Sequence, residues 1–273
     1  MKRKIWKVLA LLVAVALIVG VCWTANALNG NPVSKLLAKQ GAAAYLEEHF
    51  PETDLYIEAL GYSFKFGNYY AHVRSESSVD TRFSLHIDML GKVYFDTYES
   101  VTGGHVTASR LQEEYGALTD QIFESPAFPY PEGICYGTLE IYPQEALEDP
   151  NLTLDPRYIL KTEDLILDKV YDPRELGAQA GHLVVYVDSD TLTMEEAARI
   201  LLFIREEFDK ANIPFVTIDF MLQYPLPEEG PRPDEAIWVE KFLYEDIYGE
   251  GLEERIREAD AALRAHYDQQ DKK

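Results

Sequence analysis

Histidine and arginine side chains at polar positions of two neighbouring predicted strands are the first candidates for chemistry in this sequence. His72 and Arg74 lie in one short run, and His86 lies in the next, where Phe83, Leu85 and Ile87 alternate with polar residues. Alternation with period two places such polar residues on one face of a sheet. Imidazole and guanidinium groups bind anions, and imidazole also ligates metals. The sequence therefore predicts a ligand-binding site at His72, Arg74 and His86, with an unliganded wet sheet face as the alternative.

A second candidate is the acidic pair Asp188 and Asp190, which are separated by one serine and precede a predicted helix. Carboxylate oxygens are the ligands that calcium prefers, so this pair is the candidate metal site. The spacing does not continue into a calcium-binding loop with its terminal glutamate. Aspartate and serine are also ordinary residues of a turn between a strand and a helix, and this interpretation stays open. No other cofactor is predicted.

Signatures of catalysis are absent from the sequence. The six histidines form no pair with metal-ligand spacing, and no nucleophile elbow or phosphate-binding glycine pattern occurs. No catalytic residue is therefore assigned. With 47 acidic residues, carboxylate pairs such as glycoside hydrolases use arise by chance. Cys135 has no neighbouring histidine or cationic cluster and is interpreted as a buried apolar residue, not as a nucleophile.

The first 27 residues predict the location of the protein. Lys2, Arg3, Lys4 and Lys7 precede or flank a run without charge that extends from Val8 to Trp23. The segment from Ile5 to Ala27 would form a helix roughly 35 Å long, which is enough to span a hydrocarbon core. A cationic start holds the N-terminus in the cytoplasm, so the rest of the chain is predicted to be extracytoplasmic.

Two other fates of this leader stay open. Ala25-Asn26-Ala27 has the small residues of a signal-peptide cleavage site, and cutting after Ala27 would release the rest of the chain. Cys22 would be the attachment site of a lipid, although the preceding Val19-Gly20-Val21 places a bulky valine where a small residue is preferred.

The charge of the chain excludes one class of partner. The formal net charge is −22, and the leader holds four of the positive charges and no acid, which leaves −22 − 4 = −26 on the remainder. Such a surface repels nucleic acid and argues against lying on an anionic bilayer. An acidic, cation-binding surface protein is consistent with it. With only two cysteines, folding must rest on an apolar core and not on disulfides.

The order of predicted elements indicates an α+β protein with two small domains after the leader. Residues 31–124 read as a helix that begins at Asn31-Pro32, an antiparallel meander over 55–98 and a trailing helix over 105–124. Val33, Leu36 and Leu37 follow helical spacing and are expected to face the sheet. Residues 125–133 contain three prolines and are predicted to link the domains.

The second domain is predicted to cover residues 134–268, with a tail over 269–273. Residues 181–187 read as a buried strand, and Thr193 with Glu196 forms a capping box that opens a helix. Asn212 is expected to end that helix. In each domain helices should pack on a mainly antiparallel sheet.

Several phrases resemble the YfjL-like family, which comprises exported or membrane-anchored proteins of Gram-positive bacteria. The phrases are Asn31–Lys35, Phe83–Glu99, Ile213–Pro225 and Phe242–Ile256. The resemblance covers nearly the whole chain and implies two domains, but no catalytic residue. The helix and meander of the first domain are also similar in outline to cystatin-like and PepSY-like modules, which is a weak guide to function.

These observations favour a non-enzymatic, membrane-tethered extracytoplasmic protein that binds a partner, with a cell-envelope protein as the expected class. The membrane is contacted through the N-terminal helix, and nucleic acid is excluded. A carboxylate-dependent cell-envelope hydrolase and an acidic cation-binding surface protein remain the alternatives.

Overall fold

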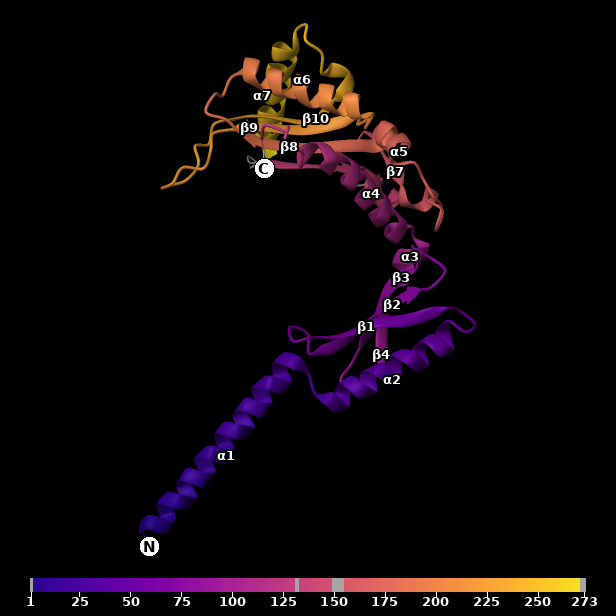
Figure 1. The fold of residues 1–273 in the computed structure, drawn as a ribbon, viewed down its shortest axis with the longest axis vertical. Coiled ribbons are helices and arrows are strands. Elements are labelled where there is room, and N and C mark those ends of the chain that lie inside the picture. The colour runs from indigo at the N-terminus through magenta and orange to yellow at the C-terminus, as the bar shows by residue number, and fades with distance from the viewer. Residues whose placement is uncertain (1, 131–132, 149–154, 271–273) are drawn as a thin grey trace. The chain divides into compact units, whose positions relative to one another are not determined.

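The structure is a computed structural model that describes residues 2–130, 133–148 and 155–270. The chain divides into two compact units, Met1–Val106 and Thr107–Lys273. Both units combine helices with a mainly antiparallel sheet (Figure 1), so the α+β prediction is confirmed.

The first unit consists of an N-terminal helix followed by a helix that packs on a four-stranded antiparallel sheet. The strand order is β1-β2-β3-β4, so each strand pairs with its neighbour in the sequence. The elements are α1 (Lys2–Asn29), α2 (Pro32–His49), β1 (Leu55–Ser63), β2 (Asn68–Ser75), β3 (Arg82–Ile87), β4 (Val93–Asp96) and α3 (Glu99–Thr102).

Helix α1 has the length and composition of a membrane anchor or of a signal sequence. The apolar segment that begins at Leu11 has a mean hydropathy of 2.3 and is long enough to cross a membrane. Its side chains from Leu11 to Val21 are exposed.

Helix α2 begins as predicted but buries a different face. The Asn31 side chain accepts a hydrogen bond from the Ser34 amide at 2.8 Å, and Pro32 occupies the first helical position. The buried face consists of small residues and one leucine, namely Ser34, Ala38, Ala42 and Leu46. The expectation that Val33, Leu36 and Leu37 face the sheet was wrong, because they are 68%, 56% and 36% exposed. Small residues every four positions let the helix axis approach the sheet closely.

At Gly41, helix α2 lies directly against the backbone of Gly91. A Cβ atom built there would lie only 1.7 Å from the carbonyl oxygen of Gly91 in the turn between β3 and β4. Gly91 has a φ of +89°, which glycine adopts without strain. In this turn the Asp88 carboxylate accepts hydrogen bonds from the amides of Leu90 and Lys92, each at 2.9 Å.

The second unit contains a mixed four-stranded sheet with the order β10-β9-β8-β5, in which β8 and β9 are parallel and the other pairs antiparallel. The elements are α4 (His105–Phe123), β5 (Ile134–Leu139), β6 (Ile141–Tyr142), β7 (Leu160–Lys161), α5 (Pro173–Ala180), β8 (Gly181–Asp188), α6 (Met194–Ala211), β9 (Thr217–Gln223), β10 (Ala236–Leu243) and α7 (Leu252–Gln270).

One apolar core unites the second unit. Helices α4, α6 and α7 contribute to it together with strands β8, β9 and β10. Leu111 and Tyr115 place α4 in this core, whereas the sequence pattern assigned residues 105–124 to the first domain and put the linker after them. Within the expected linker, Phe128 is buried, and residues 131 and 132 lie outside the described part.

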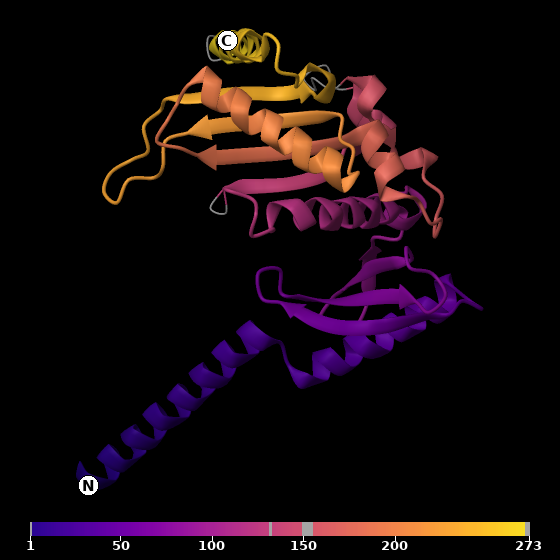
Figure 2. The same cartoon turned by 45° about the horizontal axis from the view of Figure 1, so that its top comes forward.

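The predicted helix signals in this unit are confirmed. The Thr193 hydroxyl accepts from the Glu196 amide at 3.2 Å, at the start of α6. Asn212 ends the helix with a left-handed φ of 52°. These two caps fix the crossover that joins the parallel strands β8 and β9 (Figure 2).

Candidate functional site

The first predicted site lies on the face of the first sheet opposite α2. Its three residues share that face, but each has a neighbour of its own. The Nδ1 atom of His72 is 3.1 Å from the Ser84 hydroxyl, and the Arg74 guanidinium is 3.0 Å from Glu58. The His86 ring lies 5.4 Å from the ring of Phe95. Ligand binding by His72, Arg74 and His86 stays a prediction.

The second predicted site is occupied by a protein cation. Two Asp188 oxygens accept from the Arg232 guanidinium at 2.5 and 3.3 Å. Asp190 is exposed in the following turn. Within residues 2–130, 133–148 and 155–270, no group of three histidine, cysteine or acidic side chains is arranged to hold a metal ion. Calcium binding stays a prediction. The side chain of Cys22 lies outside the described part, so its lipidation also stays one.

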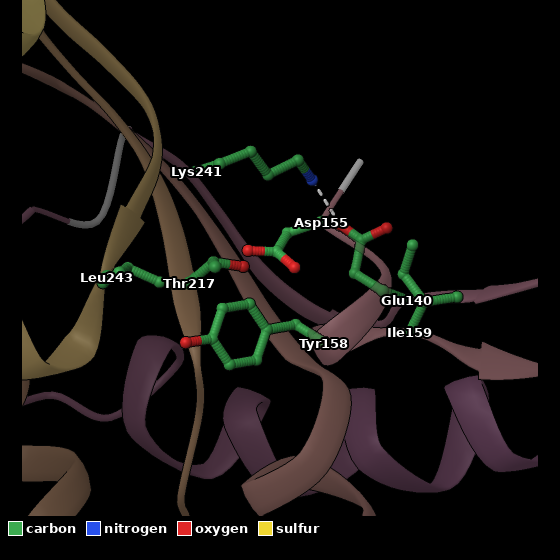
Figure 3. A pocket seen from close by; sticks show the side chains of 7 residues that line it. All are labelled: Glu140, Asp155, Tyr158, Ile159, Thr217, Lys241 and Leu243. Atoms are coloured by element: carbon green, nitrogen blue, oxygen red, sulfur yellow. Dashed lines mark hydrogen bonds and ion pairs between the residues drawn. The ribbon is translucent and has the colours of Figure 1, made fainter. Parts of the chain in front are cut away.

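A cavity in the second unit, lined by charged and apolar side chains, was not predicted from the sequence. It has a volume of about 170 Å³ and lies beside strands β9 and β10 (Figure 3). The lining residues are Glu140, Asp155, Tyr158, Ile159, Thr217, Lys241 and Leu243. Two carboxylates and one ammonium group among so few residues distinguish this cavity from a gap in the apolar core.

A β-bulge positions Lys241 at this cavity. The pairing of β10 with β9 shifts between Val239 and Phe242, so that two residues of β10 face one residue of β9. Lys241 has a left-handed φ of 51°, and its amide donates to Asp219 at 2.7 Å. A positive φ at a non-glycine residue is strained and persists only where neighbouring interactions hold it. The Asp219 carboxylate supplies one such interaction.

Two of the charged side chains that line the cavity belong to a network of hydrogen bonds and ion pairs, which continues to the buried His182 and to Asp219. The Lys241 ammonium donates to Glu140, whose side chain is only 7% exposed. His182 is buried; its Nε2 atom lies 3.3 Å from Asp219 and 3.4 Å from the Lys241 ammonium, and its Nδ1 atom lies 2.8 Å from the Thr217 hydroxyl. In the neutral tautomer that carries its proton on Nε2, His182 can donate to the Asp219 carboxylate and accept at Nδ1 from the Thr217 hydroxyl. Each buried polar group thereby gains a partner.

The network keeps the Asp219 carboxylate ionised. Burial by itself would raise the pKa of Asp219, but the hydrogen bond from His182 and the amide of Lys241 outweigh burial and hold that pKa below its ordinary value. Burial, together with a hydrogen bond to Glu140, raises the pKa of Tyr142, which therefore stays a hydroxyl at neutral pH. At neutral pH this site therefore holds an ionised Asp219 carboxylate and a protonated Tyr142 hydroxyl.

The carboxyl groups with a shifted pKa in the described residues are all shifted downward, Asp219 among them. The other carboxyl groups with a shifted pKa in the described residues are lowered as well, chiefly by a side-chain hydrogen bond from a neighbour; they are Asp54, Asp155 and Glu196. A glycoside hydrolase instead needs one carboxyl group with a raised pKa as its general acid. Burial also raises the pKa of the Cys135 thiol to about 12, so this thiol is protonated and a poor nucleophile.

The order hydroxyl, imidazole and carboxylate also occurs where enzymes activate a nucleophile. Here the hydroxyl belongs to Thr217, which is 5% exposed. Its strand is held on both sides, since Thr217 pairs with His182 in β8 and with Leu243 in β10. The Thr217 hydroxyl thus contacts the imidazole from a strand that is paired on both edges.

One signal in the sequence points to these residues. His182 opens a strand that is otherwise apolar, and Asp219 interrupts the apolar stretch around Ile218 and Phe220. A charged or polar residue inside a buried strand must find a partner. The identity of that partner is set by contacts across the fold, because Lys241 and Glu140 are 101 residues apart.

Comparison with known families agrees with the two-unit division. The model of the YfjL-like, N-terminal domain matches residues 5–97, and that of the YfjL-like C-terminal domain matches residues 114–257. The chain belongs to the YfjL-like family. The YfjL-like C-terminal match includes the whole cavity network, from Glu140 to Lys241. No curated protein and no solved structure matches the chain.

Proposed function

We propose that this chain is a membrane-tethered extracytoplasmic binding module of the cell envelope. Helix α1 spans the bilayer with its N-terminus in the cytoplasm, and the second unit binds a small ligand that bears an ammonium group. The observation that carries the tether is α1 itself, whose apolar side chains from Leu11 to Val21 are exposed.

Two further features of α1 support a retained span. Trp6 and Trp23 are 69% and 72% exposed and bracket the apolar run. Trp23 lies 17 positions after Trp6 in the helix, or about 26 Å along its axis, which is close to the thickness between the aromatic belts at the two membrane interfaces. Four cationic residues precede the run, whereas Lys35 and Lys39 are the only ones within 20 residues after Trp23. This bias places the N-terminus inside.

Protease treatment of intact cells tests this topology. We expect added protease to digest the two folded units, while the cytoplasmic N-terminus stays protected until the cells are lysed. Carbonate washing should leave the chain in the membrane fraction. If the folded units survive until lysis, the orientation is reversed. If they appear in the medium with Leu28 as the first residue, the leader is a cleaved signal peptide.

The cavity supports the proposed ligand through its charges. Glu140, Asp155 and Lys241 line it, so carboxylates outnumber ammonium groups by two to one. Glu140 already neutralises Lys241. The Asp155 carboxylate faces the cavity (Figure 3), and its partner, the Arg157 side chain, is 71% exposed. An incoming ammonium group can compete for Asp155 at this wet ion pair.

The remaining walls define the size and the apolar part of the ligand. Ile159 and Leu243 are aliphatic, and the Tyr158 ring lies across the cavity (Figure 3). A volume of about 170 Å³ holds a small organic group and not a folded partner. A short alkyl ammonium, free or at the end of a larger molecule, fits both the charge and the walls.

The matched probes n-propylammonium and propionate test this chemistry. We expect the ammonium probe to shift the amide resonances of Thr217 and Leu243 in the full chain in micelles, with a dissociation constant of about 1 mM. Propionate should shift neither. Asp155→Asn should weaken binding about tenfold, because it removes the charge that faces the ligand.

Asp190→Asn is the matched control, since Asp190 is exposed in a turn and does not line the cavity. It should leave the dissociation constant unchanged. Saturable shifts with propionate alone, or equal weakening by both asparagine variants, would count against an ammonium site.

A further inference from the structure

Exposed apolar side chains surround the point where the chain leaves α1. Phe64 and Phe66, in the turn between β1 and β2, are 69% and 72% exposed. Val33 and Leu36, in the first turns of α2, are also exposed. We call these four residues the collar. These four side chains lie outside the core of the first unit. The core itself buries the larger side chains of β2 and β3.

The hairpin turn is held beside the end of α1 by specific contacts. The Asn31 amide donates to the Tyr69 hydroxyl at 3.1 Å, and that hydroxyl donates to the Asn31 carbonyl at 3.0 Å. Tyr69 pairs with Tyr62 across the hairpin, and only the pair Ser63 and Asn68 lies between them and the turn. Figures 1 and 2 both show this turn next to the end of α1, with the start of α2 close by.

Gly30 makes this arrangement compact. It has a φ of +71°, and a Cβ atom there would lie 2.4 Å from the Tyr69 hydroxyl oxygen and 3.1 Å from the Tyr62 ring. Glycine alone therefore permits the chain to turn against the hairpin. The distance between the end of α1 and the collar is fixed by packing and not by a flexible linker.

The charge around the collar is opposite to that of the chain as a whole. Residues 24–46 contain Lys35 and Lys39 and no acidic residue, and Lys65 lies between the two phenylalanines of the turn. The whole chain carries −22. A cationic zone with exposed aromatic and aliphatic side chains has the composition that proteins place at a membrane interface.

We propose that the collar lies on the outer surface of the bilayer that α1 spans, with Phe64 and Phe66 inserted between the lipid headgroups. This inference rests on the proposed function, because the collar is near lipid only if α1 is a membrane span. Lys35, Lys39 and Lys65 contact the phosphates, and the phenyl rings reach the boundary of the acyl chains. The first unit is thereby fixed to the membrane at two elements besides the helix.

The experiment uses the full chain in vesicles of phosphatidylcholine and phosphatidylglycerol. In a Cys22→Ser, Cys135→Ala background, Lys65→Cys carries an environment-sensitive fluorophore and keeps both phenylalanines. We expect a blue-shifted emission that lipids with a shallow spin label quench. Adding Phe64→Ser and Phe66→Ser should reduce this quenching at least threefold.

Two further labels separate the possible failures. Val79→Cys, in the loop at the other end of β2, is 69% exposed and should show no lipid quenching. Val15→Cys lies in the middle of α1 and should be quenched by deep spin labels. Quenching at residue 15 but not at residue 65 overturns the collar and leaves the anchor intact. Quenching at neither position overturns the anchor.

A protein occupant of the collar is a third outcome. A second copy of the chain would shift the emission at residue 65 without lipid quenching, and the shift would disappear when the protein is diluted in lipid. That result would overturn the membrane contact as well.

Discussion

Replacing Gly41 with alanine is expected to destabilise the first unit by about 3 kcal/mol. The added Cβ atom would lie 1.7 Å from the Gly91 carbonyl oxygen, so helix α2 must move away from the sheet. The obstacle is backbone and cannot swing aside like a side chain. Moving α2 would loosen Ala38, Ala42 and Leu46 from the core of the unit.

Hydrogen exchange of the full chain, followed peptide by peptide, measures this effect. Amides of β2 and β3 should lose protection about 100-fold, while those of the second unit keep theirs. Gly116→Ala in α4 is the matched control, because its nearest contact would be an ordinary 3.4 Å. It should be neutral or stabilising by up to about 1 kcal/mol. Unchanged protection in Gly41→Ala would show that α2 does not pack this closely.

Replacing Lys241 with methionine is expected to destabilise the second unit by about 3 kcal/mol. The change leaves Glu140, 7% exposed, without the ammonium group that neutralises it. Breaking a buried ion pair costs about 3–5 kcal/mol, and we expect the low end because Lys241 is itself 37% exposed. Adding Glu140→Gln should restore most of the loss, since the uncompensated charge is then gone.

Urea unfolding in a Trp6→Phe, Trp23→Phe background measures this loss, with Trp238 of β10 as the reporter. Lys210→Met is the control: it removes exposed ion pairs with Glu206 and Glu207 and should leave the urea midpoint nearly unchanged. A double variant no more stable than Lys241→Met alone would show that the lysine acts through packing and not through charge.

Local signals in the sequence were sufficient for much of the fold. The alternation of Phe83, Leu85 and Ile87 gave the buried face of β3, and the caps at Thr193 and Asn212 gave the bounds of α6. These features depend on residues within a few positions of one another, so they can be derived without knowledge of the tertiary structure.

The features that the sequence did not reveal depend on distant contacts. The buried face of α2 is lined by alanines, which carry a weaker apolar signal than the exposed Val33 and Leu36. The cavity network joins Glu140, His182, Asp219 and Lys241 from four separate segments. The bulge that aims Lys241 needs a positive φ at a lysine, which no local propensity predicts.

The strand orders of the two sheets imply different folding speeds. In the first sheet every pairing joins neighbours along the chain, so each closes only a short loop. In the second sheet, the pairing of β5 with β8 brings Ile134 together with Tyr186, and the pairing of β8 with β9 spans the whole of helix α6. Non-local pairing slows folding. A chain synthesised from its N-terminus would therefore complete the first unit early, while the second still lacked its central strands.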